Sequence, residues 1–154
     1  MNPTLSFQNH QRVQPINIRL LRRITKVLLL EELNRSEFDL GIHLVGERTM
    51  TRMNETHLQH AGSTDIITFD YADPDRPNWL GGDLFICLSE ARIQARQFRT
   101  TWQSELVRYC IHGVLHLCGY DDHSNADRRK MKAEENRLLR RMAARFEFSH
   151  LGKR

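Results

Sequence analysis

The sequence lacks the features that mark membrane and secreted proteins. It has no run that approaches the roughly 18 consecutive apolar residues of a transmembrane helix. Its first residues do not show the charged segment and apolar segment of a secretory signal peptide. It has only three cysteines, Cys87, Cys110 and Cys118, and each lies in an apolar run. An odd number of such cysteines favours reduced, buried thiols over disulfides, so we expect a protein of the cytoplasm with no membrane contact.

Internal repeats, low-complexity tracts and flexible linkers are also missing. The 154 residues are 40% hydrophobic and 27% charged, as in ordinary globular proteins. This length is enough to bury a core without disulfides. We therefore predict a single domain that spans residues 1–154.

An excess of charge is almost absent, because the formal net charge is only +4. The distribution is more informative, since residues 128–145 (RRKMKAEENRLLRRMAAR) are dominated by Lys and Arg. Such a segment can be a solvated helix face, or it can contact phosphates through the release of counterions. The sequence leaves both interpretations open.

Hydrophobic periodicity predicts an α+β fold with a mixed four-stranded sheet and about five helices. Alternating or β-branched runs predict strands at residues 5–8, 38–45, 65–71 and 83–88. Helical spacing predicts helices at residues 15–34 and 49–58, and three more that begin near Ser89, Thr100 and Ser124. Pro15 is expected to open the first helix and Gly119 to end the fourth, while Thr100 with Gln103 and Ser124 with Asp127 resemble capping boxes.

The segment HGVLHLCGYDDH, residues 112–123, is the strongest chemical signal in the chain. His112 and His116 are four residues apart in a predicted helix, so their side chains share one face and can reach a common ion. Gly119 lets the chain turn back, so that a third ligand from residues 120–123 can approach. Three ligands and an open position are typical of a catalytic zinc site, here at the C-terminal end of a central helix. A packed pair of ordinary histidines is the alternative.

The spacing of the two histidines is that of the zinc peptidase helix HExxH, in which a Glu follows the first His as general base. Gly113 occupies that position. An amidase or peptidase is therefore disfavoured, and a glycine in the middle of a helix suggests a close approach to the backbone.

The segments HGVLHLCGYD, STDIITFDY and GGDLFICLSEARIQA resemble the YbeY family of metal-dependent endoribonucleases, and the resemblance covers about residues 40–139. It implies a mixed sheet with several helices and one zinc ion per chain. It implies cleavage of single-stranded 16S ribosomal RNA precursors at the 3′ end, and a part in ribosome quality control. Small-subunit ribosomal proteins and an assembly GTPase are the implied protein partners.

The resemblance assigns His112 and His116 as metal ligands at the catalytic centre. Where the family has its third His, this chain has Asp122, and His123 follows one residue later. We expect His123 to be the third ligand, with Asp122 as the alternative, because zinc accepts both donors. Many family members also carry an arginine where this chain has Leu58, and His57 and His60 are the nearby polar candidates for its role.

Other residues are candidates for supporting roles. Glu105 lies seven residues before His112 on the same helix face, so it could orient a ligand or carry a proton, and Asp121 could orient an imidazole. Thr64 and Asp65 are expected to line the cleft. RNA binding needs positive charge and surfaces for base stacking. Arg92, Arg96 and Arg99 share a helix face and are the predicted RNA-binding residues, with Trp79, Tyr71 and Tyr120 as possible stacking partners.

Two functions from different classes follow. The first is a metal-dependent endoribonuclease, in which the ion polarises a phosphoryl oxygen and activates water or the neighbouring 2′-OH. The second is a ribosome-assembly factor without catalytic activity, in which the metal only holds the His112 helix to the next loop.

Overall fold

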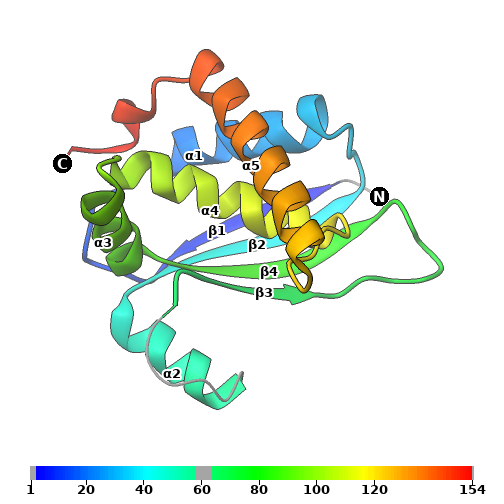
Figure 1. The fold of residues 1–154 in the computed structure, drawn as a ribbon, viewed down its shortest axis with the longest axis horizontal. Helices are drawn as coiled ribbons and strands as arrows, with labels where there is room; N and C mark the ends of the chain where they lie inside the picture. Colours follow the sequence, from blue (N-terminus) through cyan, green and yellow to red (C-terminus); the bar gives the residue numbers. More distant parts are fainter. Residues whose placement is uncertain (1–2, 58–63, 154) are drawn as a thin grey trace.

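A computed structural model describes residues 3–57 and 64–153 of the chain (Figure 1). The strands are β1 (Thr4–Asn9), β2 (Phe38–Val45), β3 (Ile66–Asp70) and β4 (Leu80–Cys87). The α-helices are α1 (Ile18–Val27), α2 (Glu47–His57), α3 (Leu88–Phe98), α4 (Trp102–Leu117) and α5 (Asn125–Arg145). A short π-helix, η1 (Leu28–Glu32), extends α1, and a short 3-10 helix, η2 (Phe148–Leu151), follows α5.

The four strands form one mixed sheet in the order β1-β2-β4-β3. Strands β1, β2 and β4 are parallel, and β3 runs antiparallel to β4. The predicted α+β class, the mixed four-stranded sheet and the five helices are therefore confirmed within the described residues.

The two faces of the sheet are covered unequally. Helices α1, α4 and α5 lie on one side of the sheet and α2 lies on the other (Figure 1). The larger core contains Leu40, Ile42 and Leu84 from the sheet, together with Leu106 and Ile111 from α4. The smaller core, on the α2 side, consists of the buried residues Val45, Met50, Ile67 and Cys87. Helix α4 is thus the central helix, packed between the sheet and α5.

Strand β4 begins three residues earlier than the sequence suggested. Gly81 and Gly82 belong to this strand. Their α-carbons are closely approached by the ring of Trp79 and by the backbone of β3, which leaves no room for a side chain. A Cβ on Gly81 would lie 2.1 Å from the ring of Trp79, and one on Gly82 would lie 2.5 Å from the carbonyl oxygen of Phe69. These glycines therefore serve close approach within the sheet and not a turn.

Several predicted helix starts are wrong by one to three residues. Asn17, and not Pro15, caps α1 by accepting a hydrogen bond from the Leu20 amide. Helix α2 begins at Glu47, ahead of the threonines that were expected near its start. Helix α3 follows β4 directly, so Ser89 lies inside its first turn.

The borders of α4 and α5 follow local capping chemistry. Thr101 caps α4 by accepting from the Ser104 amide at 3.1 Å, so the expected capping box at Thr100 is wrong. Ser124 caps α5 by accepting from the Asp127 amide at 3.0 Å, as predicted. Gly119 has a φ of 103° just after α4, which confirms it as the stop.

The cysteines agree with the expectation of thiols without disulfides, and the helices were compared with the requirements of a membrane span. Cys87 and Cys110 are buried and Cys118 is half-buried, and none of the three forms a disulfide within the described residues. Among residues 3–57 and 64–153, none of the helices combines the length and apolarity needed to cross a bilayer.

Candidate metal centre

Helix α4 brings His112 and His116 together on adjacent turns. Their ring centroids are 4.8 Å apart and their planes meet at 78°. The helix can lie close to the sheet because residue 113 is a glycine. A Cβ there would come within 2.7 Å of Leu84 and 2.9 Å of Ile66. Gly113 therefore sets the distance of the two histidines from the sheet, which is the close approach that its position in the helix suggested.

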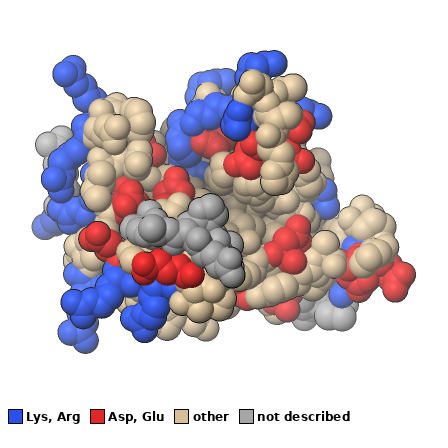
Figure 2. Space-filling model, turned by 60° about the horizontal axis from the view of Figure 1, so that its bottom comes forward, with Lys and Arg blue, Asp and Glu red and all other residues tan. Residues whose placement is uncertain are grey.

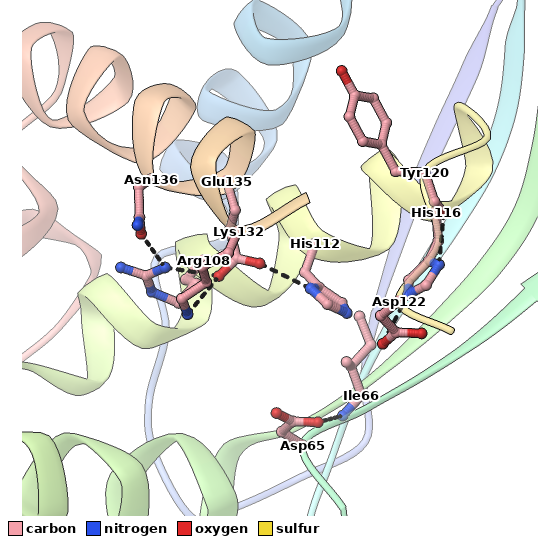
Figure 3. Close-up of polar contacts among 10 residues, drawn as sticks. All are labelled: Asp65, Ile66, Arg108, His112, His116, Tyr120, Asp122, Lys132, Glu135 and Asn136. Carbon is pink, nitrogen blue, oxygen red and sulfur yellow. Dashed lines mark hydrogen bonds and ion pairs between the residues drawn. The ribbon is translucent and has the colours of Figure 1, made fainter. Parts of the chain in front are cut away.

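The loop after α4 contributes a third donor, and this donor is Asp122. His112, His116 and Asp122 each offer one ligand atom, and these atoms all lie within 4.8 Å of one another (Figure 3). The Nε2 atom of His116 is 3.9 Å from Oδ2 of Asp122. His123 does not belong to this group; its backbone amide instead donates to Oδ1 of Asp121 at 3.2 Å. The arrangement thus favours Asp122 over the expected His123.

Both imidazoles are held through their Nδ1 atoms. Nδ1 of His112 lies 2.8 Å from Oε2 of Glu135 on α5, and Nδ1 of His116 lies 3.0 Å from the carbonyl oxygen of Tyr120 (Figure 3). When Nδ1 carries the proton, Nε2 has the free lone pair that a metal requires. The partners of the rings therefore leave both Nε2 atoms available for an ion.

Glu135 is the functional residue that sequence reasoning missed. Its side chain is only 5% exposed, and it also accepts a hydrogen bond from Arg108 at 2.7 Å, with Lys132 3.5 Å away. Burial by itself raises the pKa of this carboxyl, but the hydrogen bonds from His112 and Arg108 lower it to about 2. The carboxylate is therefore charged near neutral pH and can hold His112 in one orientation.

A sequence signal for Glu135 does exist. The buried residues of α5 are Met131, Glu135, Leu138 and Met142, which recur at helical spacing on one face. A carboxylate on an otherwise apolar stripe needs a partner inside the protein. That signal indicates a buried polar contact, although it does not name His112 as the partner.

Electrostatics favour a neutral His116. Burial lowers its pKa, and the neighbouring His112 lowers it further, while Asp122 acts in the opposite direction. Each histidine side chain is still 26% exposed, so the group can be reached from solvent. A neutral imidazole that can be reached from solvent suits metal binding.

Two expected orienting residues are not in contact with the histidines. Glu105 is buried and accepts a hydrogen bond from the Thr100 hydroxyl at 2.7 Å, so it is not the partner of His112. Asp121 bonds the His123 amide and not an imidazole. Glu135 and the carbonyl of Tyr120 occupy the places that the sequence assigned to these two carboxylates.

A cavity of about 770 Å³ adjoins the metal group, with His112 and Asp122 in its wall. Asp65 lines it, as expected for the cleft, and its carboxylate accepts the amide of Ile66 at 2.8 Å. Thr64 is half-buried beside Asp65.

The predicted RNA-binding arginines lie away from this cavity. Helix α3 contributes Gln94 and Phe98 to its wall, and not Arg92, Arg96 or Arg99. Arg92 instead donates to the carbonyl oxygen of Val13 and the side chain of Gln14.

The other aromatic and polar candidates are scattered. Tyr71 donates to Asp83, and Arg76 lies over the ring of Trp79. Tyr120 donates to Glu134, near the metal loop. His57 packs edge-on against Phe69 on the α2 side of the sheet. Leu58 and His60 lie outside the described residues.

Comparison with known proteins agrees with this architecture. The family model described as Endoribonuclease YbeY matches residues 6–143. A protein of Bacteroides fragilis named Endoribonuclease YbeY is 44% identical over 60% of this chain, and the match covers 65% of that protein, slightly under two thirds of its length. A protein of Chlorobium luteolum with the same name is 37% identical over 80% of this chain and 87% of its own length.

A solved structure shows the same fold. The solution structure of TM1509 from Thermotoga maritima matches 92% of this chain and 91% of its own with a TM-score of 0.68, at 20% identity. The family model spans almost the whole described chain, including helix α4 with His112 and His116, and this chain therefore belongs to the YbeY family.

Proposed function

We propose that this protein is a metal-dependent endoribonuclease that cleaves single-stranded ribosomal RNA precursors at the 3′ end of 16S rRNA. The observation that carries the proposal is the group of His112, His116 and Asp122, in which the Nδ1 atoms of both imidazoles are hydrogen-bonded and one donor atom from each residue lies within 4.8 Å of the others. The relatives named Endoribonuclease YbeY support RNA as the substrate.

The donor set fits zinc. Imidazole nitrogen and carboxylate oxygen are both ordinary zinc ligands, and three protein ligands leave a position open for the reaction. When bound, the ion would supply a Lewis acid that stabilises negative charge on a phosphoryl oxygen. Other divalent transition metals accept the same donors, so the identity of the metal is itself a point to measure.

The chain's own residues would prepare the site. Glu135 and the Tyr120 carbonyl oxygen keep the proton on Nδ1 of each imidazole, and so direct the lone pairs of Nε2 to one point. Arg108 and Lys132 neutralise Glu135, which keeps its negative charge from repelling the phosphate of the substrate. Gly113 lets α4 pack close to the sheet and fixes the position of the pair.

A non-catalytic assembly factor remains the second candidate, because Leu58 replaces the arginine that many family members carry. In that case the metal would join α4 to its following loop without chemistry. Ribosome quality control, small-subunit ribosomal proteins, an assembly GTPase and a cytoplasmic location remain predictions that follow from the family.

The decisive experiment is cleavage of a labelled 16S 3′-end precursor by the purified protein, with the bound metal counted. His116→Ala should lose both cleavage and metal while it stays folded. His10→Ala, an exposed histidine at the end of β1, is the matched control and should retain both. A duplex of the same sequence should resist cleavage.

Two outcomes would contradict the nuclease. If the parent protein holds its metal but does not cleave, the assembly factor becomes the better explanation. If stripping the metal with a chelator unfolds the protein, the ion is structural.

A further inference from the structure

The wall of the cavity beside the metal group contains two chemically different sets of residues. The apolar set includes Phe98 from α3, Ile66 from β3 and Met131 from α5. The basic set includes Arg128, Arg129 and Lys132, which lie near the N-terminal end of α5. Figure 2 shows this hollowed face of the molecule, with Lys and Arg atoms at its upper rim and Asp and Glu atoms beside them.

Phe98 is the unusual residue of the apolar set. It is the last residue of α3 and 62% exposed, the most exposed of the large hydrophobic residues in the described chain. An exposed aromatic ring in the wall of a cavity is a surface on which a flat ligand can stack. The cavity's volume of about 770 Å³ lies in the range of sites that bind small molecules and cofactors.

Arg129 is the unusual residue of the basic set. Arg128 contacts the carbonyl oxygen of Asp122 and the side chain of Asn125, and Lys132 lies near Glu135. Within the described part of the chain, Arg129 makes neither a hydrogen bond nor an ion pair. It projects from the N-terminal end of a 21-residue helix, where the helix dipole also favours anions.

The acidic residues in the wall have polar partners other than Arg129. Glu135 is paired with Arg108 and His112, Glu105 accepts from Thr100, Asp65 accepts the amide of Ile66, and Asp122 belongs to the metal group. Within the described residues, none of them forms an ion pair with Arg129. The guanidinium of Arg129 is therefore available to a phosphate that enters the cavity.

We infer that this cavity binds one unpaired nucleotide of the substrate RNA next to the cleavage point, with its base against Phe98 and its phosphate at Arg129. The inference rests on the proposed function and adds to it the location of substrate recognition. It also gives a physical reason for a preference for single strands, because a paired base cannot leave its stack to enter a cavity without a cost in free energy.

The test is direct binding of RNA to the metal-loaded protein, measured by fluorescence anisotropy. The probe is a labelled 2′-O-methyl copy of the single-stranded 16S 3′-end precursor, checked on a gel to remain intact. Phe98→Ala should weaken binding about tenfold, because one base loses its stacking surface, and Phe98→Trp should retain binding. Ile93→Ala is the matched control, since Ile93 is an exposed hydrophobic residue on the same helix that does not line the cavity.

The phosphate contact has its own signature. Arg129→Ala should reduce the slope of log K against log salt concentration by about 0.7, the value for one lost contact with a single strand. Phe98→Ala should leave that slope unchanged. Arg52→Ala is the control, since it removes the same charge from an exposed position of α2 outside the cavity. An unchanged slope in Arg129→Ala would overturn the assignment of the phosphate to Arg129.

The outcomes separate this inference from the proposed function. If the parent protein cleaves and binds RNA, but Phe98→Ala and Arg129→Ala behave like their controls, the cavity is not the nucleotide site and the nuclease proposal stands. If the parent neither cleaves nor binds single-stranded RNA, both proposals fail. Equal loss of binding to the intact strand and to a strand with an abasic position would overturn the role of Phe98, since its effect requires a base.

Discussion

Two histidine–carboxylate pairs of nearly equal length occupy opposite sides of the sheet. On the α4 side, His112 lies 2.8 Å from Glu135, and on the α2 side, His43 lies 2.9 Å from Asp83. Both pairs join elements that are distant in sequence. A distance criterion alone would treat them as equivalent sites.

They differ in which nitrogen is engaged and in what surrounds the ring. Glu135 bonds Nδ1 of His112, and the free Nε2 has His116 and Asp122 beside it. Asp83 bonds Nε2 of His43, whose ring stacks on Phe85 with centroids 4.2 Å apart.

The carboxylates of the two pairs also differ in their contacts and in their exposure to solvent. Asp83 accepts another hydrogen bond from the Tyr71 hydroxyl and is 32% exposed, whereas Glu135 is 5% exposed. A histidine–carboxylate pair therefore becomes a candidate metal centre only where further donors converge on the free nitrogen. Where a ring and a hydroxyl surround the pair, it stabilises the sheet surface.

The largest expected difference between the pairs is the change in zinc affinity when the histidine of each pair is removed. His112→Ala should lower zinc affinity by more than the roughly 10- to 100-fold that loss of an orienting partner costs. His43→Ala should leave zinc affinity unchanged. Competition with a zinc indicator measures both, and equal losses in the two variants would remove the distinction between the pairs.

The next largest effect is expected from substitutions of Asp122, the third donor of the metal group. Asp122→Ala should lower zinc content, and Asp122→His should restore it, because either side chain can supply a ligand at that position. His123→Ala should retain its zinc, since His123 is not part of the group. The reverse pattern would mean that the loop after α4 rearranges when the ion binds.

The two carboxylates should differ by a smaller amount. Glu135→Gln should lower zinc affinity about 10- to 100-fold, because Gln lacks the negative charge that makes the imidazole a better ligand. Asp83→Asn should not change zinc affinity. Urea unfolding of both variants, after their zinc has been removed with a chelator, controls for changes in stability. An equal loss of zinc affinity in Glu135→Gln and Asp83→Asn would contradict an orienting role for Glu135.

The smallest effect is expected at the sheet surface. Tyr71→Phe should lower the free energy of unfolding by about 0.5 kcal/mol, since it removes one partly exposed hydrogen bond to Asp83. Zinc content should not change. Urea denaturation at constant zinc measures the difference, and a loss of zinc in this variant would connect the two sides of the sheet.

Local patterns predicted much of this architecture. The alternation of residues 38–45 predicted β2 with both bounds correct, and the capping residue Ser124 marked the start of α5. The spacing of His112 and His116 placed both on one helix face. The starts of α1 and α3 were predicted less well. Asn17 caps α1 two residues after Pro15, and α3 follows β4 without a loop in which Ser89 could act as a cap.

The site depended more strongly on contacts between distant elements. Glu135 lies 23 residues after His112, and only the packing of α5 on α4 brings them together. The choice between Asp122 and His123 depends on how the loop folds after Gly119, which the local sequence pattern does not specify. The arginines of α3 had a suitable spacing, but α3 lines the cavity with Gln94 and Phe98, and the cations of the wall come from α4 and α5.

The sequence by itself determined the class of the fold, the helix that carries the two histidines and the chemistry of their nitrogens, because these follow from periodicity and residue type. Only the tertiary structure decided which third donor meets them, which carboxylate holds His112 and which cations face the adjoining cavity. These depend on distances between side chains far apart in the chain, and such distances are fixed by the packing of α4 between the sheet and α5.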